Sequence, residues 1–131
     1  MKKIVAFSAI AIVALSAWLV HSRLERSKRE VAHRAALTAY QRDLPLGISR
    51  ADVDKYLASI KATHLIEWDK EPADGPSYLI LLGEEPGDGF VCDRWNIYVS
   101  LKFKSSSGSR ERPLPSDSLR EIHIEQIGHC L

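Results

Sequence analysis

The stretch RWNIYVSLKFK, residues 94–104, has the clearest secondary-structure pattern in this chain of 131 residues. Apolar and polar side chains alternate along it with a period of two, which is the repeat of a β-strand with one buried face. We therefore expect one face of this strand to lie in the core, with Tyr98 on the opposite face. The expected core side chains are Trp95, Ile97, Val99, Leu101 and Phe103.

Three further segments have strand patterns: residues 64–68, 78–82 and 120–127. Residues 78–82, with the sequence YLILL, are apolar throughout and therefore predict a central strand of the sheet. The Pro- and Gly-containing residues 71–76 predict a turn, and residues 83–89 predict a loop. Because no helical pattern separates the four strands, the sheet is predicted to be antiparallel.

A short helix is predicted just before the strands, from Arg50 to Lys61. Ser49 is the expected N-cap, and its hydroxyl would accept the amide hydrogen of Asp52. Asp52 would complete a capping box, while Ile48 and Val53 stand at the positions of a hydrophobic staple. The predicted fold class is therefore α+β, with one capped helix packed on a roughly four-stranded antiparallel sheet.

The amino-terminal segment Ile4–Val20 carries no charge and follows Lys2 and Lys3. As a helix it would be about 25 Å long, slightly short of a hydrocarbon core of about 30 Å. It predicts either an uncleaved membrane anchor or a signal peptide, and an anchor is favoured because the small-residue cleavage sites are poor. Secretion after cleavage is the alternative.

The orientation signals of this segment disagree. The basic residues that follow it outnumber the two lysines before it, and this favours a cytoplasmic body. A short lysine-bearing start followed at once by an apolar run favours export, and the two cysteines suit an oxidising compartment. We expect a single-pass protein of the inner membrane with its body in the periplasm.

Charge divides the chain into three expected parts: residues 1–22 as anchor or signal, residues 23–43 as a basic juxtamembrane helix, and residues 44–131 as the α+β domain. Residues 23–42 have a net charge of +4, and residues 43–131 have a net charge of −5. The basic helix would be attracted to anionic headgroups, unless its charges only keep it solvated. The acidic body argues against a nucleic-acid partner.

The two cysteines stand at the ends of two predicted strands. Cys92 comes just before the longest strand, and Cys130 comes just after the last one. If these strands are antiparallel neighbours, the two cysteines meet, and a structural disulfide is expected. Two free cysteines are the alternative, while a catalytic thiol is disfavoured because there is no Cys-x-x-Cys motif.

No motif for catalysis or for a cofactor is present. His123 and His129 could join the cysteines in a zinc site, but their spacing fits no known template. The acidic residues of two predicted loops could bind calcium, although a solvated acidic rim is the commoner outcome. Those acidic residues are Glu67, Asp69, Glu71, Asp74, Glu84, Glu85 and Asp88. A small envelope enzyme or a ligand- or metal-binding protein that uses these loops or His123 is therefore the alternative function.

The segment LGISRADV, residues 46–53, followed by a short helix and an antiparallel sheet, resembles the opening of the SmpA/OmlA (BamE-like) fold of small bacterial envelope proteins. The chain lacks the lipidation cysteine of that family. It also resembles small exported bacterial proteins of uncharacterised family that end in a strand followed by Cys-Leu. Either resemblance implies a scaffold or interaction role in the envelope, with another envelope protein as partner, and implies no active-site residue.

Overall fold

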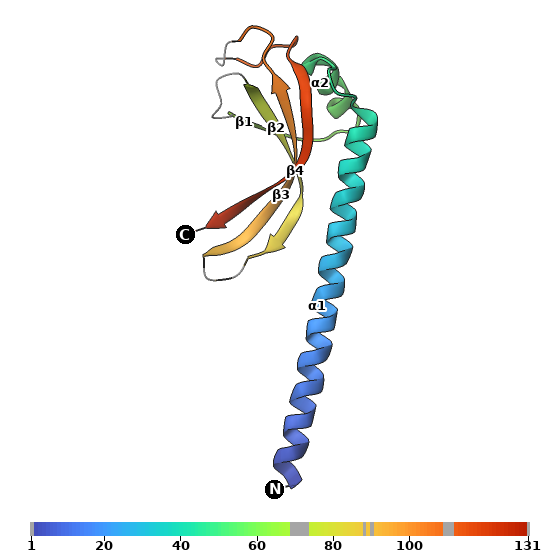
Figure 1. The fold of residues 1–131 in the computed structure, drawn as a ribbon, viewed down its shortest axis with the longest axis vertical. Helices are drawn as coiled ribbons and strands as arrows, with labels where there is room; N and C mark the ends of the chain where they lie inside the picture. Colours follow the sequence, from blue (N-terminus) through green and yellow to red (C-terminus); the bar gives the residue numbers. More distant parts are fainter. Residues whose placement is uncertain (1, 69–73, 88, 90, 109–111, 131) are drawn as a thin grey trace. The chain divides into compact units, whose positions relative to one another are not determined.

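A computed structural model describes residues 2–68, 74–87, 89, 91–108 and 112–130, without the side chains of residues 2–11, 74 and 75. The chain forms two helices and then four strands (Figure 1). The elements are α1 (Lys2–Asp43), α2 (Arg50–Ser59), β1 (Leu65–Glu67), β2 (Asp74–Pro86), β3 (Cys92–Lys104) and β4 (Ser118–Cys130). The strands form one antiparallel sheet in the order β1-β2-β3-β4, so the predicted α+β body is confirmed.

The chain divides into two compact units, residues 1–35 and residues 36–131. The second unit begins within α1, because Leu37 and Tyr40 of the last helical turns pack against the core of the body. Within the described residues, no helix has an apolar run long enough to cross a membrane. The side chains of residues 4–11 of the predicted anchor lie outside the described part of the chain.

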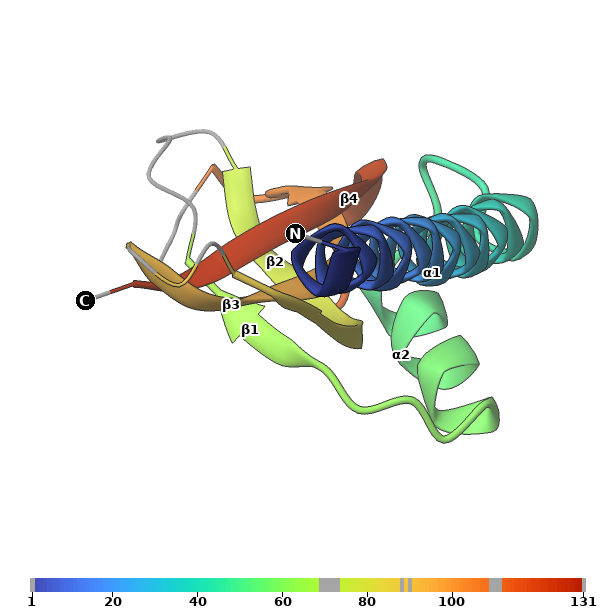
Figure 2. The ribbon, with the colours of Figure 1, turned by 90° about the horizontal axis from the view of Figure 1, so that it is seen from below.

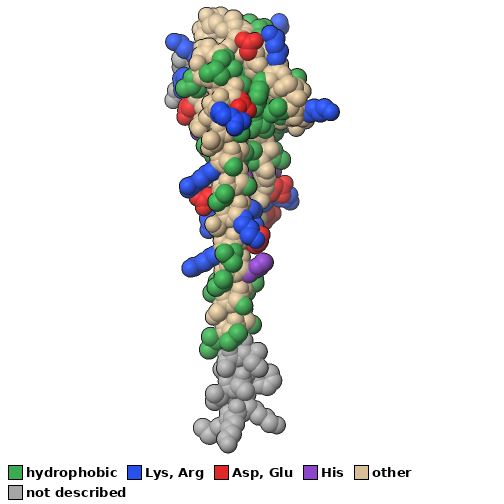
Figure 3. Space-filling view, turned by 90° about the vertical axis from the view of Figure 1, so that its right-hand side faces the viewer, with side chains coloured by type: hydrophobic (Ala, Val, Ile, Leu, Met, Phe, Trp, Pro, Cys, Tyr) green, Lys and Arg blue, Asp and Glu red, His purple; other side chains and the backbone are tan. Residues whose placement is uncertain are grey.

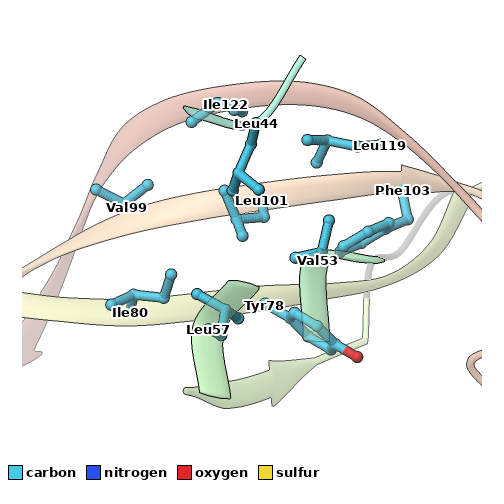
Figure 4. Close-up of a cluster of buried hydrophobic side chains, with 10 residues drawn as sticks. All are labelled: Leu44, Val53, Leu57, Tyr78, Ile80, Val99, Leu101, Phe103, Leu119 and Ile122. Atoms are coloured by element: carbon cyan, nitrogen blue, oxygen red, sulfur yellow. The ribbon is translucent and has the colours of Figure 1, made fainter. Parts of the chain in front are cut away.

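The core lies between α2 and one face of the sheet (Figure 4). Val53 and Leu57 of α2 are fully buried and point toward the central strands. Figure 2 shows α2 on one side of the sheet, with the chain running from its end into β1. The predicted core face of β3 is confirmed for Ile97, Val99, Leu101 and Phe103, which are all fully buried, whereas Trp95 is only partly buried.

The opposite face of β3 is also partly buried, which the alternating pattern did not predict. Tyr98 and Ser100 on that face are buried. The register explains part of this, because Ser100 lies between Leu79 of β2 and His123 of β4, and Tyr98 lies between Leu81 and Glu125. A small side chain between larger cross-strand neighbours loses its exposure to solvent.

The strands are longer than their sequence patterns, except for β1. β2 continues through Gly83 to Pro86, where a loop was predicted, and it begins at Asp74, inside the predicted turn. β4 runs to Cys130 rather than to Ile127. Pairing with β3 explains the longer β2 and the longer β4, since both strands pair with β3 along their extended parts. Glu84, Glu85 and Pro86, for example, lie opposite residues of β3 and so adopt strand geometry despite their low propensity for it.

Candidate functional site

Cys92 and Cys130 form a disulfide bond, as the sequence predicts. They begin β3 and end β4, and the register of these antiparallel strands places them directly opposite each other. Their separation in sequence is 38 positions, for which the chain-entropy model gives roughly 3 to 4 kcal/mol of stabilisation. Because both cysteines are paired, neither provides a thiol for catalysis or a thiolate for zinc.

Ser49 is the N-cap of α2, and its hydroxyl accepts the amide hydrogen of Asp52 at 3.2 Å. The Asp52 carboxylate accepts hydrogen bonds from the Ser49 hydroxyl at 2.8 Å and from the Lys55 ammonium at 3.1 Å. The capping box had predicted a bond to the Ser49 backbone amide instead. The Ser49 hydroxyl, followed by Lys55, lowers the pKa of Asp52. These contacts stabilise the first turn of α2.

A buried arginine next to this cap was not expected from the sequence. Arg50, the first residue of α2, is 2% exposed. The centre of its guanidinium lies 3.8 Å from the centroid of the Phe103 ring and 4.8 Å from that of Tyr78. Its Nη2 donates to the carbonyl of Pro76 at 2.8 Å. The guanidinium therefore lies over two rings that themselves pack edge to face at 5.1 Å, and it makes a cation–π contact with each.

Asp117 balances the charge of this arginine. Its Oδ2 accepts from Arg50 at 3.3 Å and from the Leu114 amide at 3.0 Å, and its Oδ1 accepts from the Ser106 amide at 3.0 Å. Burial raises the pKa of Asp117, but the two amides and Arg50 together bring it below the ordinary value. The pair joins the start of α2 to the loop before β4, so its role is structural.

His123 lies on the face of the sheet opposite α2, between two glutamates of the same strand. Its Nδ1 is 3.4 Å from a carboxylate oxygen of Glu121, and its Nε2 is 3.7 Å from one of Glu125. Ser100 lies directly opposite His123, but its buried hydroxyl has no hydrogen-bond partner in the structure as described. A serine nucleophile requires a hydrogen bond to its base, and this arrangement does not provide one.

The acidic residues proposed as calcium ligands are only partly described. Asp69, Glu71 and Asp88 lie outside the described residues, as does the side chain of Asp74. Glu84 is half-exposed and lies 3.4 Å from the guanidinium of Arg94 on β3. Among the residues that the structure describes, no three His, Cys, Asp or Glu side chains are arranged to hold a metal ion.

The feature that points to binding is the edge of the sheet formed by β1 and β2. β1 pairs with β2 only from Ser77 to Leu79. On the outer side of β2 from Leu81 to Glu84, the described part of the chain places no further strand. Backbone groups at such an edge can pair with another strand.

Apolar side chains surround this open edge. Leu65 is 61% exposed, Trp68 54% and Leu81 52%, and Ile66 is also exposed. Beside them is a hollow of about 200 Å³. The hollow is lined mainly by apolar side chains: Thr63, His64, Leu65, Leu79, Leu81 and Tyr98. We call β1, the outer edge of β2 from Leu81 to Glu84, and this hollow the β2-edge site.

A second hollow, of about 330 Å³, lies beside β4. It is lined by Gln41, Leu44, Leu46, Arg120, Glu121 and Ile122. Here the side chain of Gln41 donates to the backbone carbonyl of Ile122 at 3.2 Å, and residues 47–50 form backbone hydrogen bonds with Asp117 and Leu119. The start of β4 is therefore already covered by the chain itself, whereas the outer edge of β2 is not.

Comparisons with known proteins give no relative: no family model, no curated protein and no solved structure matches this chain. The fold and the site define the class only as a disulfide-bonded α+β domain with an open apolar sheet edge, carried on a long helix.

Proposed function

We propose that this protein is a membrane-tethered interaction domain of the bacterial envelope. Residues 4–20 would anchor it in the inner membrane as a single pass, with the body in the periplasm. The β2-edge site would bind an extended segment of another envelope protein, which would add a strand to the sheet. The uncharged run in the sequence supports the tether, and the disulfide suits an oxidising compartment.

The observation that carries this proposal is the combination of an open strand edge and exposed apolar side chains at one place. A strand that adds to a sheet gains main-chain hydrogen bonds, and side-chain pockets then select its sequence. The β2-edge site offers both, because the hollow beside Leu81 can receive one apolar side chain of the partner. Clusters of exposed apolar side chains often mark a surface that binds another protein.

Charge favours a basic or neutral partner segment over an acidic one. The body from residue 43 to residue 131 has a net charge of −5. An approaching acidic strand would be repelled, whereas a lysine or arginine next to an apolar residue would match the site. Complementary charge of this kind increases the rate of association and the specificity.

Site-specific photo-crosslinking in intact cells tests the proposal. A photoreactive residue at Ile66 should give a discrete adduct, and peptide mapping should place it on an extended segment of one envelope protein. Leu81→Glu should reduce that adduct by about tenfold, a loss of roughly 1.4 kcal/mol. Ser116→Glu, which adds the same charge at an exposed loop position, is the matched control.

Equal adduct yields from the Leu81→Glu and Ser116→Glu variants would contradict the proposed site. A photoreactive residue at Arg112, in the exposed loop before β4, shows the background of unspecific capture. Both glutamate variants should stay folded, with melting temperatures within a few degrees of the wild type, because both positions are more than a third exposed.

A further inference from the structure

The segment Arg23–Arg34 of α1 concentrates positive charge. It contains five basic residues and two acidic ones, which leaves a net charge of +3. Both glutamates are already paired within the helix: Glu25 with Lys28 at 2.9 Å and Glu30 with Arg34 at 2.7 Å. The excess of positive charge on this segment is therefore not balanced by its own acidic residues. We call it the basic segment.

The position of the basic segment along the helix matters more than its net charge. Arg23 follows the end of the uncharged run at Val20 by three residues, which is about 4.5 Å along a helix axis, and Arg26 follows by about 9 Å. The polar layer on each side of a bilayer is about 5 to 8 Å thick. The Debye length in physiological salt adds about 8 Å of electrostatic reach. If the run ends at the membrane boundary, these guanidinium groups lie at headgroup depth or just beyond.

The angular distribution of the charges distinguishes two ways of meeting a membrane. At about 100° per residue, Arg23, Arg26 and Arg29 spread over about 120° of the helix circumference, while Lys28 lies on the far side. Leu24 and Val31 are exposed, and no broad apolar face separates the charges. Figure 3 shows Lys and Arg side chains projecting to both sides of the helix. This pattern does not suit a helix lying on a membrane, but it suits one that passes upright through a ring of headgroups.

We propose that Arg23, Arg26 and Arg29 bind the headgroups of anionic phospholipids around the base of α1. The inference rests on the proposed tether, because the headgroups surround the helix only if the preceding residues lie in the bilayer. The phosphates accept hydrogen bonds from the guanidinium groups. Each basic residue near an anionic surface contributes about a fivefold preference for it.

A fluorescent label next to these residues measures the contact in the full chain. Ser27→Cys introduces the one reactive thiol, because Cys92 and Cys130 form a disulfide. The labelled protein is reconstituted into vesicles of phosphatidylcholine, or of phosphatidylcholine mixed with phosphatidylglycerol, each with a quencher on a small share of the headgroups. Quenching should be several-fold stronger with phosphatidylglycerol, and high salt should remove the difference.

Charge-neutral variants identify the groups responsible. Replacing Arg23, Arg26 and Arg29 together by glutamine should abolish the preference for phosphatidylglycerol. The matched control replaces three exposed lysines of the body, Lys55, Lys61 and Lys104, and should leave the preference unchanged. Equal quenching in both vesicles, or an unchanged preference in the variant without the three basic residues, would overturn the inference.

Flotation of the same vesicles separates this inference from the tether on which it rests. Protein that floats with both vesicle types but shows no lipid preference overturns the headgroup site and leaves the tether standing. Protein that floats with neither type overturns both. Protein that floats only with phosphatidylglycerol, and only at low salt, binds the surface without an inserted anchor and also overturns both.

Discussion

At the residue scale, Arg50 is the charged side chain whose removal should destabilise the body most. Arg50→Ala would leave the Asp117 carboxylate buried without its cation and would open a cavity beside Tyr78 and Phe103. Removing one partner of a buried ion pair typically lowers the free energy of unfolding by about 3 to 5 kcal/mol. Urea denaturation of the wild type and the variant measures this loss directly.

A double variant separates the charge from the packing. Arg50→Met retains an apolar stem beside the two rings, and Asp117→Asn removes the charge that would otherwise stay unpaired. The double variant should therefore be more stable than Arg50→Met alone, because it leaves no isolated buried ion. If Arg50→Ala unfolds at the same urea concentration as the wild type, the arginine is not buried as described.

Acid should also weaken the Arg50–Asp117 pair. Because the pKa of Asp117 is lowered in the folded protein, the stability should fall as the pH falls. In the unfolded chain Asp117 binds a proton near its ordinary pKa of 3.8, whereas in the folded protein it does so at lower pH. Between these two values the unfolded state holds more protons, so stability falls as the pH falls. The Asp117→Asn variant should lose less free energy of unfolding than the wild type when the pH drops below about 4.

At the element scale, α2 ends in an unusual way. The amide of Lys61 bonds to the carbonyl of Ala58, and the amide of Ala62 bonds to that of Leu57, which together form a Schellman motif. Lys61 occupies the left-handed position of this motif with a φ of 54°, where glycine is usual. The predicted helix end at Lys61 was therefore wrong, because this residue already turns the chain away from the helix.

The same geometry predicts a stabilising substitution. Lys61→Gly should raise the free energy of unfolding by up to about 1 kcal/mol, since glycine has no side-chain clash at positive φ. The gain is partly offset by the greater freedom of glycine in the unfolded chain. At the other end of α2, Ser49→Ala should lower stability by about 1 kcal/mol. A destabilised Lys61→Gly variant would show that this turn is not left-handed.

In the sheet, Leu101 provides the clearest test of the core. It is fully buried on β3 and lies opposite Tyr78 and Ile122. Leu101→Ala should cost about 2 to 5 kcal/mol, as large-to-small changes do in a closed core. Leu81→Ala on β2 removes the same atoms from a half-exposed position and should cost about 0.5 kcal/mol. Equal midpoints in thermal denaturation would mean that the register was misread.

The elements were predictable from the sequence where one local pattern dominated. The alternation of residues 94–104 and the cap at Ser49 each identify their element without reference to the rest of the chain. The extensions of β2 and β4 depend on pairing with β3, which no local pattern records. Burial of Arg50 depends on Phe103 and Asp117, which lie 53 and 67 positions away in sequence. The open edge of β2 was equally invisible, because it depends on how short β1 is.

At the scale of the whole molecule, the disulfide and the proposed topology depend on each other. Cys92 and Cys130 lie opposite each other at the ends of β3 and β4, so the fold brings them together in any compartment. Only an oxidising compartment keeps them joined. Mass spectrometry of the unreduced protein from freshly isolated envelope should show the linked pair of peptides. Two cysteines that can both be alkylated there would contradict export of the body.

A reporter enzyme that is active only outside the cytoplasm tests the orientation independently. Fused after Leu131, it should be active, and the mature protein should still begin at its own amino terminus and retain Lys2. We expect the uncharged residues 4–20 to direct this export. Their deletion, which is the matched control, should therefore abolish the reporter activity. Arg23, Arg26 and Arg29 act against this orientation, because basic residues usually remain on the cytoplasmic side.

The possible outcomes of the reporter experiment separate the remaining topologies. An inactive reporter together with alkylatable cysteines would place the body in the cytoplasm, where the basic segment would then meet the inner leaflet. An active reporter on a soluble fragment that begins near Ala17 or Arg23 would keep the export and replace the anchor by a cleaved signal. In that case the basic segment would form the free end of a secreted protein, and its proposed contact with headgroups would be lost.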